Sequence, residues 1–81
     1  MLIKFEEVIC TSTDSAVSYY PFAVRIKDII KVTPGGIVQL SGEHYTNILV
    51  ECYDEGEYTT NYKVLGKFED IFNMCNTLEI L

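Results

Sequence analysis

Residues 45–75 read YTNILVECYDEGEYTTNYKVLGKFEDIFNMC, and they carry more information about the fold than any other part of the chain. On both sides of Asp54-Glu55-Gly56, apolar and polar residues alternate, which is the pattern of two half-buried strands joined by a turn. After Gly66 the apolar residues follow the i, i+3, i+4, i+7 spacing of a helix with one buried face. This stretch therefore predicts a β-hairpin followed by an amphipathic helix.

The pairing register of this hairpin follows from the composition of its faces. A two-residue loop would pair Val50 with Asn61 and would mix apolar and polar side chains on one face. A three-residue loop at residues 54–56 gives a uniform inner face, with Cys52 opposite Tyr58, Val50 opposite Thr60, Ile48 opposite Tyr62 and Thr46 opposite Val64. We expect this second register, because a one-residue slip would move every side chain to the other face. Its turn needs a left-handed backbone, which Gly56 supplies.

The helical spacing is carried by Phe68, Ile71, Phe72 and Cys75. A helix of about ten residues is too short to be stable alone in water, so packing against the sheet must support it. We expect Phe68 and Phe72 to fill the open end of the sheet. Asn76-Thr77 is the expected end of the helix, and residues 78–81 then form an apolar tail.

The first half of the chain predicts three more strands. Residues 2–9 form a strand with Ile3, Phe5 and Ile9 on one face, and residues 10–18 form a polar loop. Pro21 is excluded from a central ladder because it has no N–H to donate. Residues 22–33 alternate as one long strand, residues 34–36 (Pro-Gly-Gly) form a hairpin turn, and residues 37–40 form a short strand. The inner face expected for the long strand consists of Phe22, Val24, Ile26, Ile30 and Val32.

The whole chain, residues 1–81, is therefore predicted to be one small α+β domain that is mostly β. We expect about five mainly antiparallel strands in a curved sheet or partly open barrel, with one short C-terminal helix.

Composition bounds the class of protein. Of the 81 residues, 48% are hydrophobic and 22% charged, as in ordinary globular proteins. No apolar run approaches the roughly 18 residues of a membrane span, and the N-terminal residues turn acidic where a secretion signal would be apolar. Cys10, Cys52 and Cys75 are odd in number and widely spaced, which favours free thiols in a reducing cytoplasm. We therefore expect a cytoplasmic protein without a membrane segment.

Catalytic and metal-binding patterns are weak. His44 is the single histidine, and we interpret it as a solvated turn residue. The cysteines and His44 lack the paired spacing of a zinc site. Gly35-Gly36 does not lead from a strand into a helix, so it is not a phosphate-binding loop. We predict no enzymatic activity, no metal and no cofactor.

The basic residues are unevenly distributed. A net charge of −6 argues against general binding of nucleic acid or anionic membranes. However, Arg25, Lys27 and Lys31 occupy alternate positions on the predicted strand 22–33. They are either a solvated face paired with neighbouring carboxylates, or a site for an anionic ligand, a nucleotide or an acidic partner.

Several apolar and aromatic residues have no clear place in the core. Tyr is favoured at interfaces, and Tyr19-Tyr20 lies outside any regular alternation. The candidate interface comprises Tyr19, Tyr20, Leu49, Tyr53, Leu78, Ile80 and Leu81. These residues favour self-association as a homodimer or higher oligomer, through a sheet edge or through the aromatic residues.

The order of strands and helix over residues 22–76 resembles that of LytTR-type DNA-binding domains. The resemblance lies in RIKDIIKV at residues 25–32 and in the helix after Val64-Leu65-Gly66. A looser likeness links the same region to short flagellar regulatory proteins of the FlbD type. The chain lacks the basic, His-containing half that LytTR-type domains carry after this segment, so no DNA-binding residue is transferred to it.

Two functions remain in view. The first is a non-enzymatic protein-binding or adaptor module that self-associates; a small regulatory protein, including a phage-encoded inhibitor, would fit it. The alternative is a binder of small anionic ligands or nucleotides that uses the basic residues.

Overall fold

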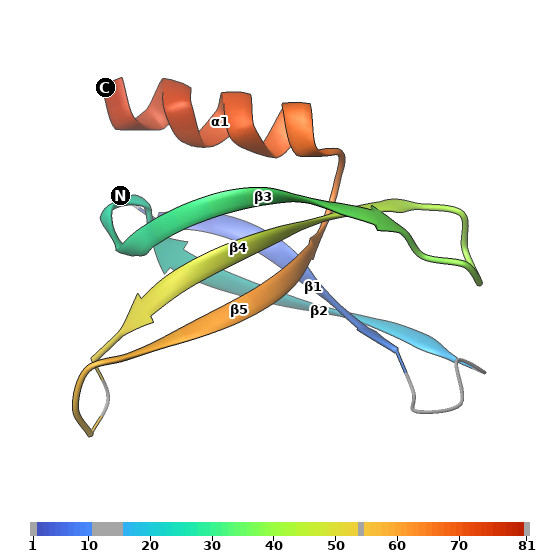
Figure 1. Ribbon diagram of the computed structural model, residues 1–81, viewed down its shortest axis with the longest axis horizontal. Coiled ribbons are helices and arrows are strands. Elements are labelled where there is room, and N and C mark those ends of the chain that lie inside the picture. The colour runs from blue at the N-terminus through green and yellow to red at the C-terminus, as the bar shows by residue number, and fades with distance from the viewer. Residues whose placement is uncertain (1, 11–15, 54, 81) are drawn as a thin grey trace.

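A computed structural model describes residues 2–10, 16–53 and 55–80 (Figure 1). The elements are β1 (Leu2–Cys10), β2 (Val17–Arg25), the 3₁₀ segment η1 (Ile26–Asp28), β3 (Ile29–Ile37), β4 (His44–Cys52), β5 (Tyr58–Leu65) and α1 (Phe68–Ile80). The five strands form one open antiparallel sheet in the order β2-β1-β5-β4-β3. The predicted class is confirmed: a mostly β domain with five antiparallel strands and a single C-terminal helix.

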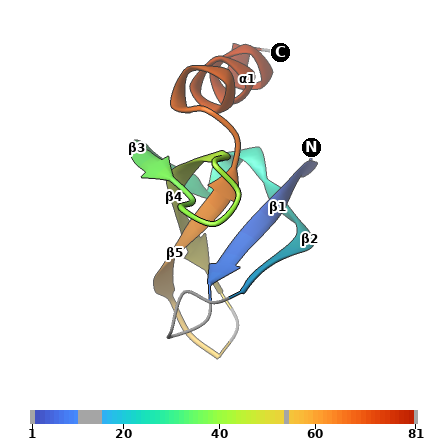
Figure 2. The ribbon, with the colours of Figure 1, turned by 90° about the vertical axis from the view of Figure 1, so that its right-hand side faces the viewer.

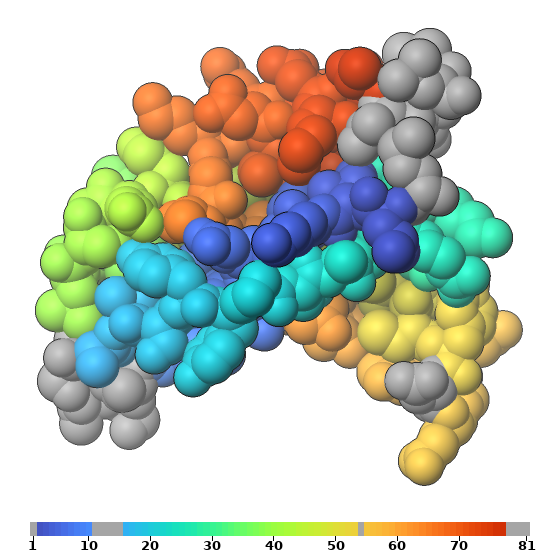
Figure 3. All heavy atoms as spheres, turned by 180° about the vertical axis from the view of Figure 1, so that it is seen from behind, coloured from blue at the N-terminus to red at the C-terminus, as the bar shows by residue number. Residues whose placement is uncertain are grey.

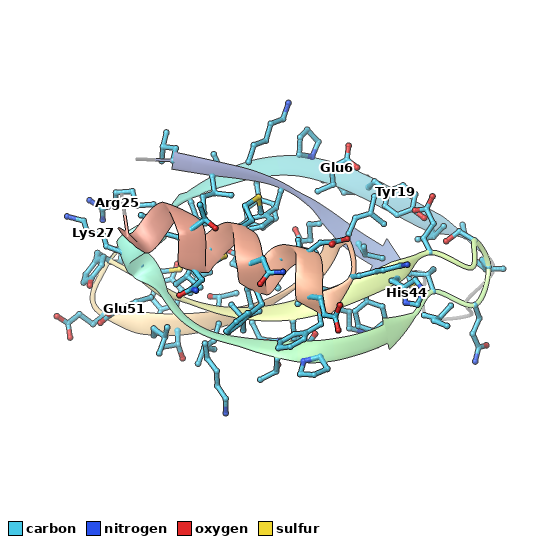
Figure 4. The ribbon with its side chains drawn as sticks, turned by 90° about the horizontal axis from the view of Figure 1, so that it is seen from above. Glu6, Tyr19, Arg25, Lys27, His44 and Glu51 are labelled. Carbon is cyan, nitrogen blue, oxygen red and sulfur yellow. The ribbon has the colours of Figure 1, made fainter. Side chains whose placement is uncertain are left out.

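The sheet is strongly curved because of how its edges are connected. β2 and β3 follow each other in the chain but lie at opposite edges of the sheet, and only η1 joins them. The two edges must therefore approach each other at that end. Helix α1 packs over β3, η1 and β4. Seen from above, it covers the opening between the β1–β2 side and the β3–β4 side of the sheet (Figure 4).

The main core lies between the inner face of the sheet and the helix. It contains the buried residues Ile3, Phe5, Ile48, Val50, Val64, Ile71 and Cys75. The Phe22 ring lies 6.0 Å from Phe5 and 4.8 Å from Tyr62, measured between ring centroids. This aromatic row joins β2, at the edge, to β1 and β5 in the middle of the sheet.

Two hydrogen bonds position the start of the helix. The buried Thr46 hydroxyl donates to the Gly66 carbonyl at 2.9 Å, and the Gly66 N–H donates to the His44 carbonyl at 2.9 Å. Gly66 has a φ of 131°, which favours glycine. The chain therefore leaves β5 beside the start of β4 and enters α1 directly above the sheet.

The predicted register of the β4–β5 hairpin is confirmed. Cys52 pairs with Tyr58, Val50 with Thr60, Ile48 with Tyr62 and Thr46 with Val64. Gly56 has the expected positive φ, at 116°, and Glu55 joins it in the left-handed region at 56°. Asp54 lies outside the described residues.

Replacing Gly56 with Val should lower the free energy of unfolding by about 1 kcal/mol or more. A Cβ atom at this position would have no neighbour within 4 Å, so the effect comes from backbone conformation alone. Urea denaturation measures it. Thr59→Val, at an exposed position of β5, is the matched control and should be nearly neutral. A Gly56→Val protein as stable as this control would contradict the prediction.

The predicted long strand at residues 22–33 is wrong. The chain ends β2 at Arg25, turns through η1 and begins β3 at Ile29. The Arg25 guanidinium lies 2.8 Å from the Asp28 carboxylate, and this ion pair bridges the turn. A bulge between Ile29 and Lys31 then shifts the register, so that Val32 still packs against the core as predicted, together with Phe22, Val24 and Ile26, but Ile30 does not. Ile30 is 52% exposed, whereas Ile29 packs against the core.

The predicted turn at residues 34–36 is also wrong, as is the short strand at 37–40. Pro34, Gly35 and Gly36 lie within β3, where a bulge between Pro34 and Gly36 accommodates the extra residue. A Cβ atom at Gly35 would collide with the carbonyl oxygen and ring of Tyr45. The glycine therefore serves close packing between strands rather than a turn. The connection to β4 instead turns through residues 39–41.

Both prolines of the chain lie in edge strands, Pro21 in β2 and Pro34 in β3. The exclusion of Pro21 from a central strand is thus confirmed. The loop predicted for residues 10–18 is too long, because β2 already begins at Val17; residues 11–15 lie outside the described part of the chain. A proline in each edge strand interrupts the row of N–H donors that another strand would need.

The helix is longer than predicted, and one residue of its predicted buried face, Phe72, is exposed. It continues through Asn76-Thr77 to Ile80, so Leu78 and Ile80 belong to the helix rather than to a tail, and Leu81 lies outside the described residues. Ile71 and Cys75 are buried, whereas Phe72 is 47% exposed and stacks on Phe68 at 5.6 Å. The helix residues that face the core are Ile71 and Cys75. Phe72 lies beside this buried face, so it does not fill the opening of the sheet.

Candidate functional site

The three basic candidates do not lie on one strand face. Arg25 ends β2, Lys27 lies in η1 and Lys31 lies in β3, so the expectation of alternate positions on one strand is wrong. Arg25 and Lys27 do lie together at the η1 end of the molecule (Figure 4). However, Arg25 pairs with Asp28 at 2.8 Å, which compensates its charge. The structure therefore provides little support for an anion site built from all three residues.

The aromatic candidates are divided between the two ends of the molecule. Tyr19, on β2, is half-buried and donates a hydrogen bond from its hydroxyl to Ser41 Oγ at 3.0 Å, beside the β3–β4 turn. Tyr20 follows it and is 55% exposed. Tyr53, which is 51% exposed, follows β4 at the other end. Figure 4 shows the two ends, with Tyr19 and His44 at one and Glu51 at the other.

Carboxylates gather around Tyr53, at the end of the molecule that also carries Arg25 and Lys27. The pKa of the Tyr53 phenol is raised above its usual value, first because its hydroxyl hydrogen-bonds to the Glu51 carboxylate and then by desolvation. The negative charges of Glu51, Asp28 and Glu57 raise it further. Three carboxylates, from β4, η1 and the β4–β5 loop, thus act on the Tyr53 hydroxyl.

The remaining interface candidate, Leu49, is half-buried on the outer face of β4, between Lys31 and Asn61.

A second apolar cluster lies on the opposite face of the sheet from the main core. The buried positions of β1 change parity from Ile3 and Phe5 to Val8, and the predicted inward residue Ile9 is 43% exposed. Val8 and Val38 are both buried, yet neither belongs to the main core. Figure 2, which looks at this end, shows the β3–β4 turn crossing in front of β4 and β5 with β1 beside it.

This second cluster forms the floor of a shallow depression of about 180 Å³, which we call the turn-end groove. Its rim is apolar and exposed: Ile37 is 56% and Leu40 is 52% accessible. The groove is lined by Val8, Cys10, Ile37, Val38, Gln39, Leu40, Tyr45 and Lys63. In the space-filling view, the yellow-green turn stands at the edge of the molecule beside the light-blue start of β2 (Figure 3).

One polar contact belongs to the groove. Lys63 Nζ lies 5.4 Å from the centroid of the Tyr45 ring, within the range of a cation–π interaction. Tyr45 and Lys63 occupy outward positions of β4 and β5, so the groove opens away from the helix.

Strand alternation does not predict this groove. Its signal in the sequence is the apolar group Ile37, Val38 and Leu40 beside Ser41 and Gly42, which favour a turn. The short strand predicted for residues 37–40 would spread these side chains along a sheet, whereas the chain turns through residues 39–41.

A second depression, of about 350 Å³, lies between β1 and the helix. Its lining residues Phe5 and Ile71 are core residues, and Met74 packs against that core. It is therefore a shallow extension of the helix–sheet contact. Lys4, Glu6 and Leu65 complete its lining.

The remaining candidates for chemistry stay separate. His44 is exposed at the start of β4, Cys10 is exposed, Cys52 is half-buried and Cys75 is buried. Within residues 2–10, 16–53 and 55–80, no three His, Cys, Asp or Glu side chains are grouped to hold a metal ion. Over the same residues, no helix has the length and apolar character needed to cross a membrane.

Comparison with protein-family models, with curated proteins and with solved structures finds no match to this chain. The resemblance to LytTR-type domains therefore carries no function to this protein.

Proposed function

We propose that this protein is a non-enzymatic protein-binding module that self-associates and serves a regulatory or adaptor role. The observation that carries the proposal is the turn-end groove, with two aliphatic side chains more than half exposed above a buried apolar floor. Exposed apolar surface that is contiguous around a depression is typical of protein interaction sites.

The charge of the protein favours a protein partner over a polyanion. With a net charge of −6, the chain repels nucleic acids and anionic lipid surfaces at long range. Self-association through apolar groups is compatible with this charge, because an apolar contact does not depend on long-range attraction.

The proposal is tested by the molar mass in solution. Light scattering after size exclusion, and sedimentation equilibrium, should give at least twice the 9.2 kDa chain mass as the concentration rises from micromolar to millimolar. The association should persist in high salt, which screens ionic contacts and not apolar ones. A mass of 9.2 kDa over the whole range would contradict the proposed function.

A further inference from the structure

We infer that the turn-end groove is the contact surface between two copies of this chain, related by a two-fold axis. The inference rests on the proposed self-association and names the surface that carries it. In this arrangement the Leu40 side chain of each copy enters the groove of the other. A symmetric contact of this kind uses the same surface on both copies, so that surface must be complementary to itself.

The rim of the groove is not required by the fold. The turn is closed by hydrogen bonds from the Val38 N–H to the Glu43 carbonyl at 2.8 Å and from the Gly42 N–H to the Val38 carbonyl at 2.7 Å. Gly42 adopts the positive φ that the turn needs, at 72°. These backbone groups would form the same turn with a polar residue at position 40. Together with Ile37, Leu40 therefore forms an exposed apolar rim that the turn itself does not require.

The size of the groove selects the kind of occupant. Small-molecule sites usually have volumes of about 300–1,000 Å³, whereas this depression measures about 180 Å³. An apolar floor of Val8 and Val38 with so little volume suits one aliphatic side chain from a partner protein. Leu40 is such a side chain, and every copy of the chain presents it.

The distribution of charge favours a second copy over a strongly basic partner. The groove carries Lys63 on its lining and Glu43 on the adjoining turn, so both signs are present on one surface. Glu51, which acts on Tyr53, lies at the far end of the molecule together with Arg25 and Lys27 (Figure 4). A two-fold contact through the turn end therefore does not bring the Glu51 carboxylates of the two copies together.

The edges of the sheet are less suited to the same task. Pro21 interrupts the β2 edge and Pro34 interrupts the β3 edge, and neither residue has an N–H to offer a new strand. Association through side chains at the groove needs no backbone hydrogen bonds from either edge strand.

The test compares single substitutions on the groove with matched substitutions elsewhere. Leu40→Ser and Ile37→Thr remove apolar rim from the groove, whereas Ile30→Thr and Tyr53→Ser remove exposed apolar surface from other places. Sedimentation equilibrium should show a dissociation constant raised at least about tenfold by each groove variant and changed less than about threefold by each control. All four positions are about half exposed, so melting temperatures should confirm that the variants fold.

The outcomes separate this inference from the proposed function. A wild-type dimer that dissociates on Leu40→Ser, and not on Tyr53→Ser, supports both. A wild-type dimer that survives Leu40→Ser and Ile37→Thr overturns the groove as the interface and leaves self-association standing. A wild-type chain that is monomeric at millimolar concentration overturns both.

Cys10 provides a second measurement, because it is exposed and lines the groove. A short bismaleimide should join the Cys10 thiols of two copies, and Cys10→Ser should abolish the cross-linked dimer. Leu40→Ser in the presence of Cys10 should reduce the yield severalfold. An equal yield from the Leu40→Ser protein would show that the copies do not meet at the groove.

Discussion

Replacing Ile71 with Ala is expected to lower the free energy of unfolding by about 2–5 kcal/mol. Ile71 is only 6% exposed and lies in the main core, so truncation leaves a cavity between the helix and the sheet. For a domain of this size, such a loss removes a large share of the total stability, which is typically about 5–15 kcal/mol. Urea denaturation followed by circular dichroism measures the change directly.

The matched control for this prediction is Phe72→Ala on the adjacent position of the helix. Phe72 is 47% exposed, and its ring stacks on Phe68 at 5.6 Å. Losing this contact should cost about 0.5–1.5 kcal/mol beyond the small apolar area that the half-exposed ring buries. If Phe72→Ala proved more destabilising than Ile71→Ala, the helix would present a different face to the sheet from the one described.

Replacing Gly35 with Ala is expected to destabilise the protein by about 3 kcal/mol or more, and to prevent folding at physiological temperature if the domain is only marginally stable. A methyl group at this position would collide with the Tyr45 carbonyl oxygen and ring. The carbonyl belongs to the backbone of β4, so the collision can be relieved only by moving one strand away from the other. Thermal denaturation should show a large fall in the melting temperature.

Gly36→Ala is the control for this second prediction. A Cβ atom at Gly36 would lie 3.4 Å from the Tyr45 hydroxyl oxygen, at the far end of a side chain. We expect a change of less than about 1 kcal/mol, because a side chain can move aside at low cost. Equal stability of the Gly35→Ala and Gly36→Ala proteins would be incompatible with the bulge between Pro34 and Gly36.

The hairpin of β4 and β5 could be predicted in full register because its determinants are local. Thr46, Ile48 and Val50 alternate with polar residues, and the opposite strand has the same period. Gly56 provides the positive φ that the connection requires. Strand period and turn chemistry act within one continuous segment, so no contact from elsewhere was needed to choose between the two registers.

The presence of the helix could be predicted from the sequence, but which of its apolar residues face the sheet could not. The spacing of Phe68, Ile71, Phe72 and Cys75 indicates one apolar face that is broad enough to be rotated either way. The Thr46 and Gly66 hydrogen bonds at the helix start, together with contacts to β3 and η1, turn Ile71 and Cys75 inward. This rotation exposes Phe72, which is larger than either buried residue.

The first half of the chain was interpreted less well, because its signals depend on distant contacts. Residues 34–36 have the composition of a turn, yet they form strand because Tyr45 lies against Gly35. Residues 22–33 alternate like one strand, yet they divide at η1 because the chain must pass from one edge of a curved sheet to the other. Neither Tyr45 nor the sheet order is visible from the local pattern.

The candidate site, too, depends partly on the local sequence pattern and partly on contacts between segments that are distant in the chain. Alternation in β1 indicates that its two faces differ, but Val8 is buried on the outer face, where it shares the floor of the groove with Val38, just after the end of β3. The turn-end groove therefore exists only where β1, the β3–β4 turn, β4 and β5 meet. Local periodicity determines which side chains share a face, and segments brought from elsewhere in the chain determine whether that face is covered or left open to a partner.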